Sequence, residues 1–225
     1  MTDAITLSMP QLGSHQLRIL SPTVLELVLI NAKAPDPSRV ARWDFVDANG
    51  QFNPPASSEF VVLADGQAMG VQSVGFKRRP LYAPIRQRDL RIADHLYLKL
   101  ASPIATDRTV VVQNPSQRLW PTHWQFVAKA DPLRYSPAIH VNQVGYLPQF
   151  SKTGLVGYYL GNLGELTIDQ ASAFQLIDHR TGGIVFESML TRREDKGYQY
   201  TPPPSNSHYD PYVVPALAGP REKTG

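Results

Sequence analysis

The stretch AIHVNQVGYLPQ, residues 138–149, divides the chain into two parts. Before it lies DPLRYSP (131–137), a seam whose two prolines cannot donate backbone hydrogen bonds and so interrupt any sheet that reaches them. After the seam, apolar and polar residues alternate over 139–142, the period of a half-buried strand, and GYLP (145–148) then turns the chain away. The pattern predicts a first domain over 1–131, a proline-rich linker over 132–137 and a second domain that opens at residue 138.

The composition of the chain favours β-structure. Its 225 residues include 20 prolines, 15 glycines and no cysteine, and 42% are hydrophobic, which is enough apolar surface for two cores. Short apolar runs without a sustained 3.6-residue period predict an all-β architecture and leave no room for a helical catalytic barrel. The absence of cysteine excludes a disulfide framework and a zinc–thiolate site.

The first half reads as a series of strands. The run LELVLI (25–30) suits a strand that enters a core, and FVVL (60–63) with MGVQSV (69–74) predicts a hairpin around Asp65-Gly66. The alternating HLYLKL (95–100) follows, and two more strands are expected over 110–112 and 124–127. In this order of strands the first domain resembles bacterial Ig-like domains of the S-layer type, which implies a β-sandwich.

The second half carries a more specific resemblance. IHVNQVGYLP (139–148) resembles the first strand of the Ig-like domain that precedes the catalytic barrel in family 9 glycoside hydrolases, the cellulase family. FQLIDHRTGGIVF (174–186) is similar to a later hairpin of that domain, so the resemblance covers about 138–200. It implies a second Ig-like β-sandwich in tandem with the first, with strands expected over 155–160, 174–177 and 184–190.

The pattern fails beyond Tyr200, where a proline-rich linker and an irregular tail are expected over 201–225. The final strands typical of the family domain are not found there, so the second sandwich is expected to be incomplete at its C-terminus. We expect the chain to be a truncated or frame-shifted piece of a longer glycosidase. The catalytic carboxylates of the family would lie in the barrel, so no catalytic residue is carried over to this chain.

The resemblance implies a non-catalytic accessory region whose partner is the (α/α) barrel of a parent glycosidase, a β-1,4-glucan hydrolase. An alternative is a free-standing carbohydrate-binding module, and a third class is a structural surface module. Sugar rings pack their C–H faces on exposed aromatic rings, so the candidate residues for binding β-glucan are Trp43, Trp120, Trp124 and Tyr82. Trp120 precedes a proline at a strand entry and is expected to be the exposed one, whereas Trp124 is expected in the core.

Other constellations point to ordinary surface roles. Paired carboxylates at Asp44 and Asp47, and at Glu194 and Asp195, are interpreted as solvated charges, and DANG (47–50) as a turn rather than a calcium loop. The six histidines have no metal-ligand spacing, so neither a metal nor another cofactor is expected.

The basic stretch from Lys77 to Arg91 is expected to be a loop, although a polyanion site is the alternative. A net charge of +3 does not argue for nucleic acid or membrane as a partner. No signal peptide is visible and no apolar run is long enough to span a membrane, and the compartment stays open.

Overall fold

The computed structural model describes residues 10–32, 43–47, 49, 51–81, 91–169 and 171–193. These residues form antiparallel strands and two short 3-10 turns, η1 (Ser57–Glu59) and η2 (Gly161–Leu163), which confirms the all-β prediction. The chain divides into two compact units, Met1–Thr167 and Ile168–Gly225. In the described part, no helix is long and apolar enough to cross a membrane.

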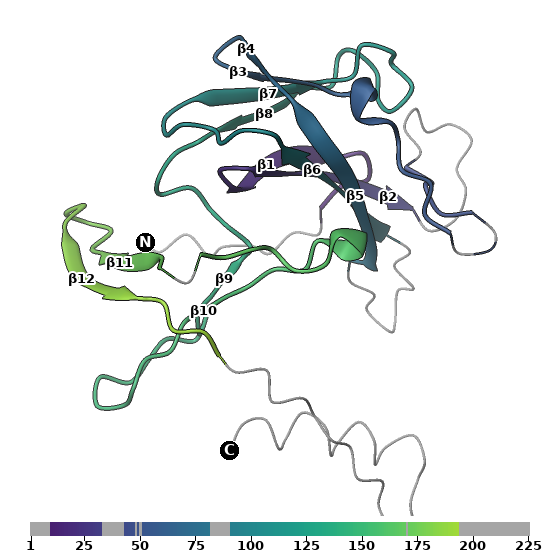
Figure 1. The fold of residues 1–225 in the computed structure, drawn as a ribbon. Helices are drawn as coiled ribbons and strands as arrows, with labels where there is room; N and C mark the ends of the chain where they lie inside the picture. The colour runs from purple at the N-terminus through teal and green to yellow at the C-terminus, as the bar shows by residue number, and fades with distance from the viewer. Residues whose placement is uncertain are drawn as a thin grey trace, which may run out of the picture. The chain divides into compact units, whose positions relative to one another are not determined.

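The first unit contains two four-stranded sheets (Figure 1). One has the order β1-β2-β6-β5, and its strands are β1 (His15–Ser21), β2 (Val24–Ala32), β6 (Arg91–Leu100) and β5 (Val71–Pro80). The other has the order β4-β3-β7-β8, and its strands are β4 (Gln67–Met69), β3 (Val61–Ala64), β7 (Thr109–Gln113) and β8 (Phe126–Lys129). Because immunoglobulin domains order their strands A-B-E-D and C′-C-F-G, this topology confirms the Ig-like sandwich.

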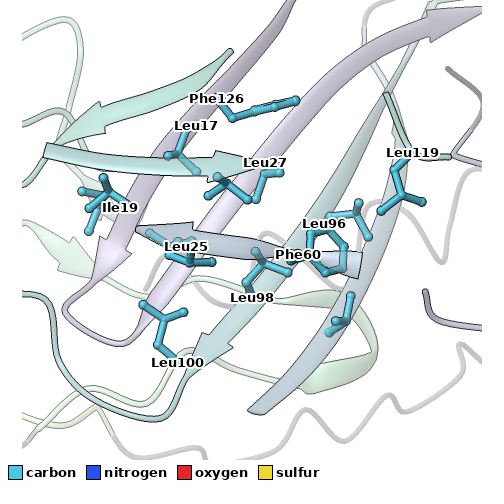
Figure 2. Packing of buried hydrophobic residues seen from close by; sticks show 14 of the residues in the cluster. Leu17, Ile19, Leu25, Leu27, Phe60, Leu96, Leu98, Leu100, Leu119 and Phe126 are labelled. Carbon is cyan, nitrogen blue, oxygen red and sulfur yellow. The ribbon is translucent and has the colours of Figure 1, made fainter. Parts of the chain in front are cut away.

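The core lies between the two sheets. Leu25, Leu27 and Leu29 alternate along β2 and are fully buried, because every second side chain of a strand faces the opposite sheet. Figure 2 shows Leu25 and Leu27 of β2 in this core together with Leu96, Leu98 and Leu100 of β6. The alternation predicted for β6 is therefore the inner face of a sandwich.

The hairpin predicted around Asp65-Gly66 is confirmed, with one difference. Asp65 and Gly66 both have positive φ, 45° and 83°, as a two-residue type I′ turn requires. The returning arm was expected to run unbroken over 69–74, but β4 ends at Met69 and the chain crosses at Gly70 into β5 of the other sheet. One apolar run thus supplies a strand to each of the two sheets. Sequence periodicity alone does not distinguish such a run from a single continuous strand.

The proline-containing seam (131–137) contacts the sandwich of the first unit. Arg134 donates a hydrogen bond from Nε to the carbonyl oxygen of Ile19 on β1, at 2.8 Å. The strands expected over 139–142 and 155–160 shorten to β9 (Ile139–His140) and β10 (Leu155–Val156), which pair with each other. The domain boundaries drawn at 131, 137 and 200 stay predictions.

The described part of the second unit contains the hairpin expected over 174–190. Its strands are β11 (Ala173–Ile177) and β12 (Ile184–Met189), paired antiparallel. Asp178 shapes the connecting turn, since its Oδ1 accepts hydrogen bonds from the backbone of Arg180 and Thr181. The tail over 201–225 and the pair Glu194 and Asp195 lie outside the described residues.

Candidate functional site: a buried polar cluster beneath residues 157–166

A row of residues crosses the outer face of the first sheet. The strand registers place Arg18 opposite Glu26, Glu26 opposite Tyr97, and Tyr97 opposite Gly75. Directly opposed residues in an antiparallel sheet project from the same face, so these four positions form one line across β1, β2, β6 and β5. Glu26 and Tyr97 are fully buried on a face that a sandwich normally exposes to solvent.

Glu26 is the centre of this cluster. Its Oε1 accepts a hydrogen bond from Nδ1 of His95 at 2.8 Å and another from the hydroxyl of Tyr158 at 2.7 Å. Its Oε2 accepts one from Nη1 of Arg18 at 3.1 Å. A buried carboxylate is tolerated only when donors replace the lost water, and Glu26 has three.

The electrostatics of the cluster follow from this geometry. Burial opposes the charge on Glu26, but the His95 bond and charge, the Tyr158 bond and the charge of Arg18 together lower its pKa to about 2. Burial and the neighbouring Glu26 charge raise the pKa of Tyr97 and of Tyr158 well above the usual range. Glu26 is therefore a charged acceptor, and both phenols stay protonated.

Residues 157–166, which we call the strap, cover the cluster. The strap is closed on itself by a bond from Leu166 N to Tyr158 O and by the bridge between Tyr159 and Glu165, and it contains η2. It brings Tyr158 onto the sheet face, where Nζ of Lys77 lies 4.3 Å from the centre of the Tyr158 ring. This cation–π contact adds to the bond with Glu26.

The strap also covers the free edge of β5, the last strand of its sheet. Phe76 donates its backbone N–H to Oδ1 of Asn162 at 2.7 Å, and Lys77 donates from Nζ to the carbonyl of Tyr159 at 2.7 Å. In Figure 1, η2 lies beside β5. An unpaired strand edge invites association with other chains, so the strap protects this edge without adding a strand.

Two glycines allow the close approach. A Cβ at Gly161 would collide with the backbone carbonyl of Phe76, and Gly161 has a φ of 65°, which favours glycine. Across the contact, the side chain of Leu163 occupies the space that a Cβ of Gly75 would need. The strap and β5 therefore each need a glycine at the point where they meet.

The buried cluster around Glu26 holds the strap in place. It lacks the features of a glycosidase centre. Acid–base hydrolysis needs two carboxylates facing across a cleft, whereas Glu26 is covered and paired with Arg18. Three polar atoms of the cluster, Nε of Arg18, Nε2 of His95 and the hydroxyl of Tyr97, have no hydrogen-bond partner among the described residues. Sequence reasoning missed the cluster, although a glutamate inside the apolar run LELVLI was a signal.

The structure describes three of the four predicted sugar-binding residues, and it brings Trp43 and Trp120 together in the core. Trp43 is 0% exposed and donates from Nε1 to the carbonyl of Leu119, and Trp120 is 2% exposed and packs against Trp43, Phe60 and Phe126. The expectation that Trp120 is exposed is therefore wrong. Asn114 accepts a bond from Leu119 N at 2.9 Å, and this turn directs both Leu119 and Trp120 into the core.

Trp124 is half-buried rather than enclosed in the core. One face of its indole stacks on the His15 ring, with centroids 4.4 Å apart and an interplanar angle of 10°. That stacking occupies a face that a sugar ring would need. Tyr82 lies outside the described residues.

The remaining predicted positions have structural partners. Asp44 pairs with Arg78 at 3.2 Å, and Oδ1 of Asp47 accepts bonds from the backbone N–H groups of Asn49 and Gln51, which supports the turn interpretation. Within the described ranges, no three His, Cys, Asp or Glu side chains gather to hold a metal.

The basic stretch is not wholly a loop, because Lys77–Pro80 belong to β5 and Arg91 begins β6. Arg78 is held there by Asp94, whose Oδ1 accepts from Nε at 2.7 Å. Arg86 and Arg88 lie outside the described residues.

Comparison with known proteins bears on the segment that contributes the strap. Residues 134–206 match the family model of the cellulase N-terminal Ig-like domain. This confirms the resemblance seen at 139–148 and 174–186, and it indicates an accessory role in a cellulase-like protein. No curated protein and no solved structure matches the chain.

We call residues 134–206 the cellulase-type segment. It includes the strap and the hairpin β11–β12, and it begins at Arg134, the residue that bonds to β1. The buried cluster is therefore the place where the Ig-like sandwich of the first unit holds part of the cellulase-type segment.

Proposed function

We propose that this chain is a non-catalytic accessory region of a family 9-like cellulase, and that it packs against and stabilises a catalytic (α/α) barrel. The observation that carries the proposal is the match of residues 134–206 to the cellulase N-terminal Ig-like domain. In this proposal, hydrolysis of β-1,4-glucan is performed by carboxylates of the barrel, and the chain supplies support and orientation.

Exposed apolar side chains in the cellulase-type segment support a protein partner. On one face of the hairpin, Phe174 is 41% exposed, Leu176 58% and Phe186 54%, and the two phenylalanine rings lie 5.8 Å apart. A hairpin is marginally stable alone, so an apolar face of this kind is expected to be covered in the working protein. A barrel surface of matching apolar character would fit it.

The test measures the thermal stability of a family 9 barrel that lacks its own Ig-like domain, with and without this chain. Binding to the folded barrel raises its unfolding midpoint by mass action, so we expect an increase that grows with chain concentration. The double variant Phe174→Ser/Phe186→Ser should abolish the increase, and Gln175→Ala on the other face should retain it. An unchanged midpoint at saturating chain concentration would refute the barrel-packing role.

Carbohydrate binding is a second proposal, and it now depends on Trp124 and Tyr82 because Trp43 and Trp120 are buried. The test is depletion of the chain from solution by insoluble β-glucan, with sugar release measured in parallel. Depletion that is lost in Trp124→Ala would support a binding module. Equal recovery from the supernatant with and without β-glucan would rule it out.

A further inference from the structure

The strap makes no backbone-to-backbone hydrogen bond with the sandwich in the described part of the chain. Its backbone hydrogen bonds join residues of the strap to one another or to Ala138, as in the bond from Gly157 N to Ala138 O at 2.8 Å. The bonds to the sandwich all use a side chain, from Tyr158, from Asn162 or from Lys77. A segment outside the strand ladder can leave without breaking the ladder.

The stretch that leads into the strap is also loosely held. Residues 139–156 are exposed throughout, including Val144 at 98% and Leu147 at 60%. Tertiary burial begins again inside the strap, where Leu160 is 5% and Leu166 is 8% exposed. The contact with the sandwich is therefore a local one, bounded by exposed chain on its N-terminal side.

We propose that the strap is a reversible latch, which closes over β2, β6 and β5 and opens as one unit, with the Tyr158–Glu26 hydrogen bond as its lock. Closure couples part of the cellulase-type segment to the Ig-like sandwich, and opening releases it. The value of this coupling for orienting a barrel rests on the proposed function, but the latch itself does not.

Tyr158 fits the role of a lock because, within the described part of the chain, its phenol makes the one hydrogen bond from the strap to a fully buried charge. Bonds to charged groups are the stronger hydrogen bonds of proteins, and this one is shielded from water. After its removal, Glu26 still has His95 and Arg18 as partners, so the sandwich does not inherit an unpaired buried charge. The latch can therefore be opened without unfolding what lies beneath it.

The experiment is hydrogen exchange followed by mass spectrometry on the full chain. The variants are Tyr158→Phe, which removes the lock, and Gly161→Ala, which blocks closure because a Cβ meets the Phe76 carbonyl. Tyr159→Phe is the matched control, since the Tyr159 side chain is 58% exposed and only its backbone carbonyl receives a bond from the sandwich.

We expect exchange in peptides covering 157–166 to rise about tenfold or more in both variants, the effect of losing a bond to a charge. The Phe76 amide should follow, and peptides from β2 and β7 should not change. A uniform rise across all peptides would show that the strap is an inseparable part of the sandwich, and no rise in either variant would show that it has no lock. Both results would overturn the latch, and neither depends on a barrel partner.

Discussion

A carboxylate stays ionised inside a protein only where donors replace its lost water. Glu26 has its donors on three elements: Arg18 on β1, His95 on β6 and Tyr158 on the strap. The fully buried Glu26 charge is thereby shared between the sandwich and the cellulase-type segment. The cluster thus makes one ionisable residue responsible for part of the stability of the first unit.

Acid should weaken this contribution. The pKa of Glu26 is lowered from 4.5 to about 2 in the folded chain, so its stabilising effect is complete above pH 4.5 and is lost as the pH falls toward 2. The shift corresponds to about 3 kcal/mol. Denaturant unfolding of the wild type and of Glu26→Gln should give free energies that differ most near neutral pH and converge in acid. A difference that is constant with pH would contradict the assignment.

The tryptophans should differ in their effect on stability. Trp120→Ala removes a buried indole packed on three aromatic rings and should lower the free energy of unfolding by about 3–5 kcal/mol. Trp124→Ala, at a half-buried position, should cost clearly less. Equal losses in urea unfolding would contradict the burial difference between the two side chains.

At the scale of elements, the type I′ turn between β3 and β4 depends on backbone conformation. Gly66 has a φ of 83° with open space around its Cα, so Gly66→Ala meets conformational strain without a steric clash. The left-handed conformation costs a non-glycine residue about 1–2 kcal/mol, which should appear as lost unfolding free energy. The control is Gly70→Ala, where the new Cβ meets Ala101 at an ordinary 3.4 Å and the loss should be smaller.

The strands of the two units differ in how much of their surface is buried. The strands of the sandwich bury one face against an opposite sheet, and part of the outer face lies under the strap. All but one of the strand residues of the hairpin β11–β12 are exposed in the described structure. The first kind of element is stabilised by its own unit, whereas the second is the kind that a partner is expected to cover.

At the scale of the whole molecule, the two compact units predict independent folding of the first. A chain ending at Thr167 should keep the unfolding midpoint of the full chain within a few degrees, because its core and strap are complete. All three tryptophans of the sequence lie in this unit, so their fluorescence reports its transition.

Ending the chain at residue 133 provides the contrasting case. It removes the strap and leaves Glu26 without Tyr158, so the midpoint should fall. Identical midpoints for the two shortened chains would show that the strap does not stabilise the sandwich.

The local β-features could be read directly from the sequence. The strands of β2, β6 and β7, the Asp65-Gly66 turn and the hairpin β11–β12 were all predictable from alternation and turn chemistry. The split at Gly70 was not, because the same apolar run serves two sheets. The exposure of Trp120 was mispredicted because a turn at Asn114 decides its direction.

The all-β class and the resemblance of the cellulase-type segment were predictable from the sequence alone, since period, turn residues and motif are local properties, whereas the two tandem sandwiches stay a prediction. The cluster of Glu26, His95 and Tyr158, in contrast, forms only in the folded chain. Their bonds join residues 69 and 132 positions apart in the chain, and such pairs meet only when strands take their register and a strap closes over them. Whether a charged side chain is buried depends on how the strands and the strap pack together, so the alternation of residues along one strand does not predict it.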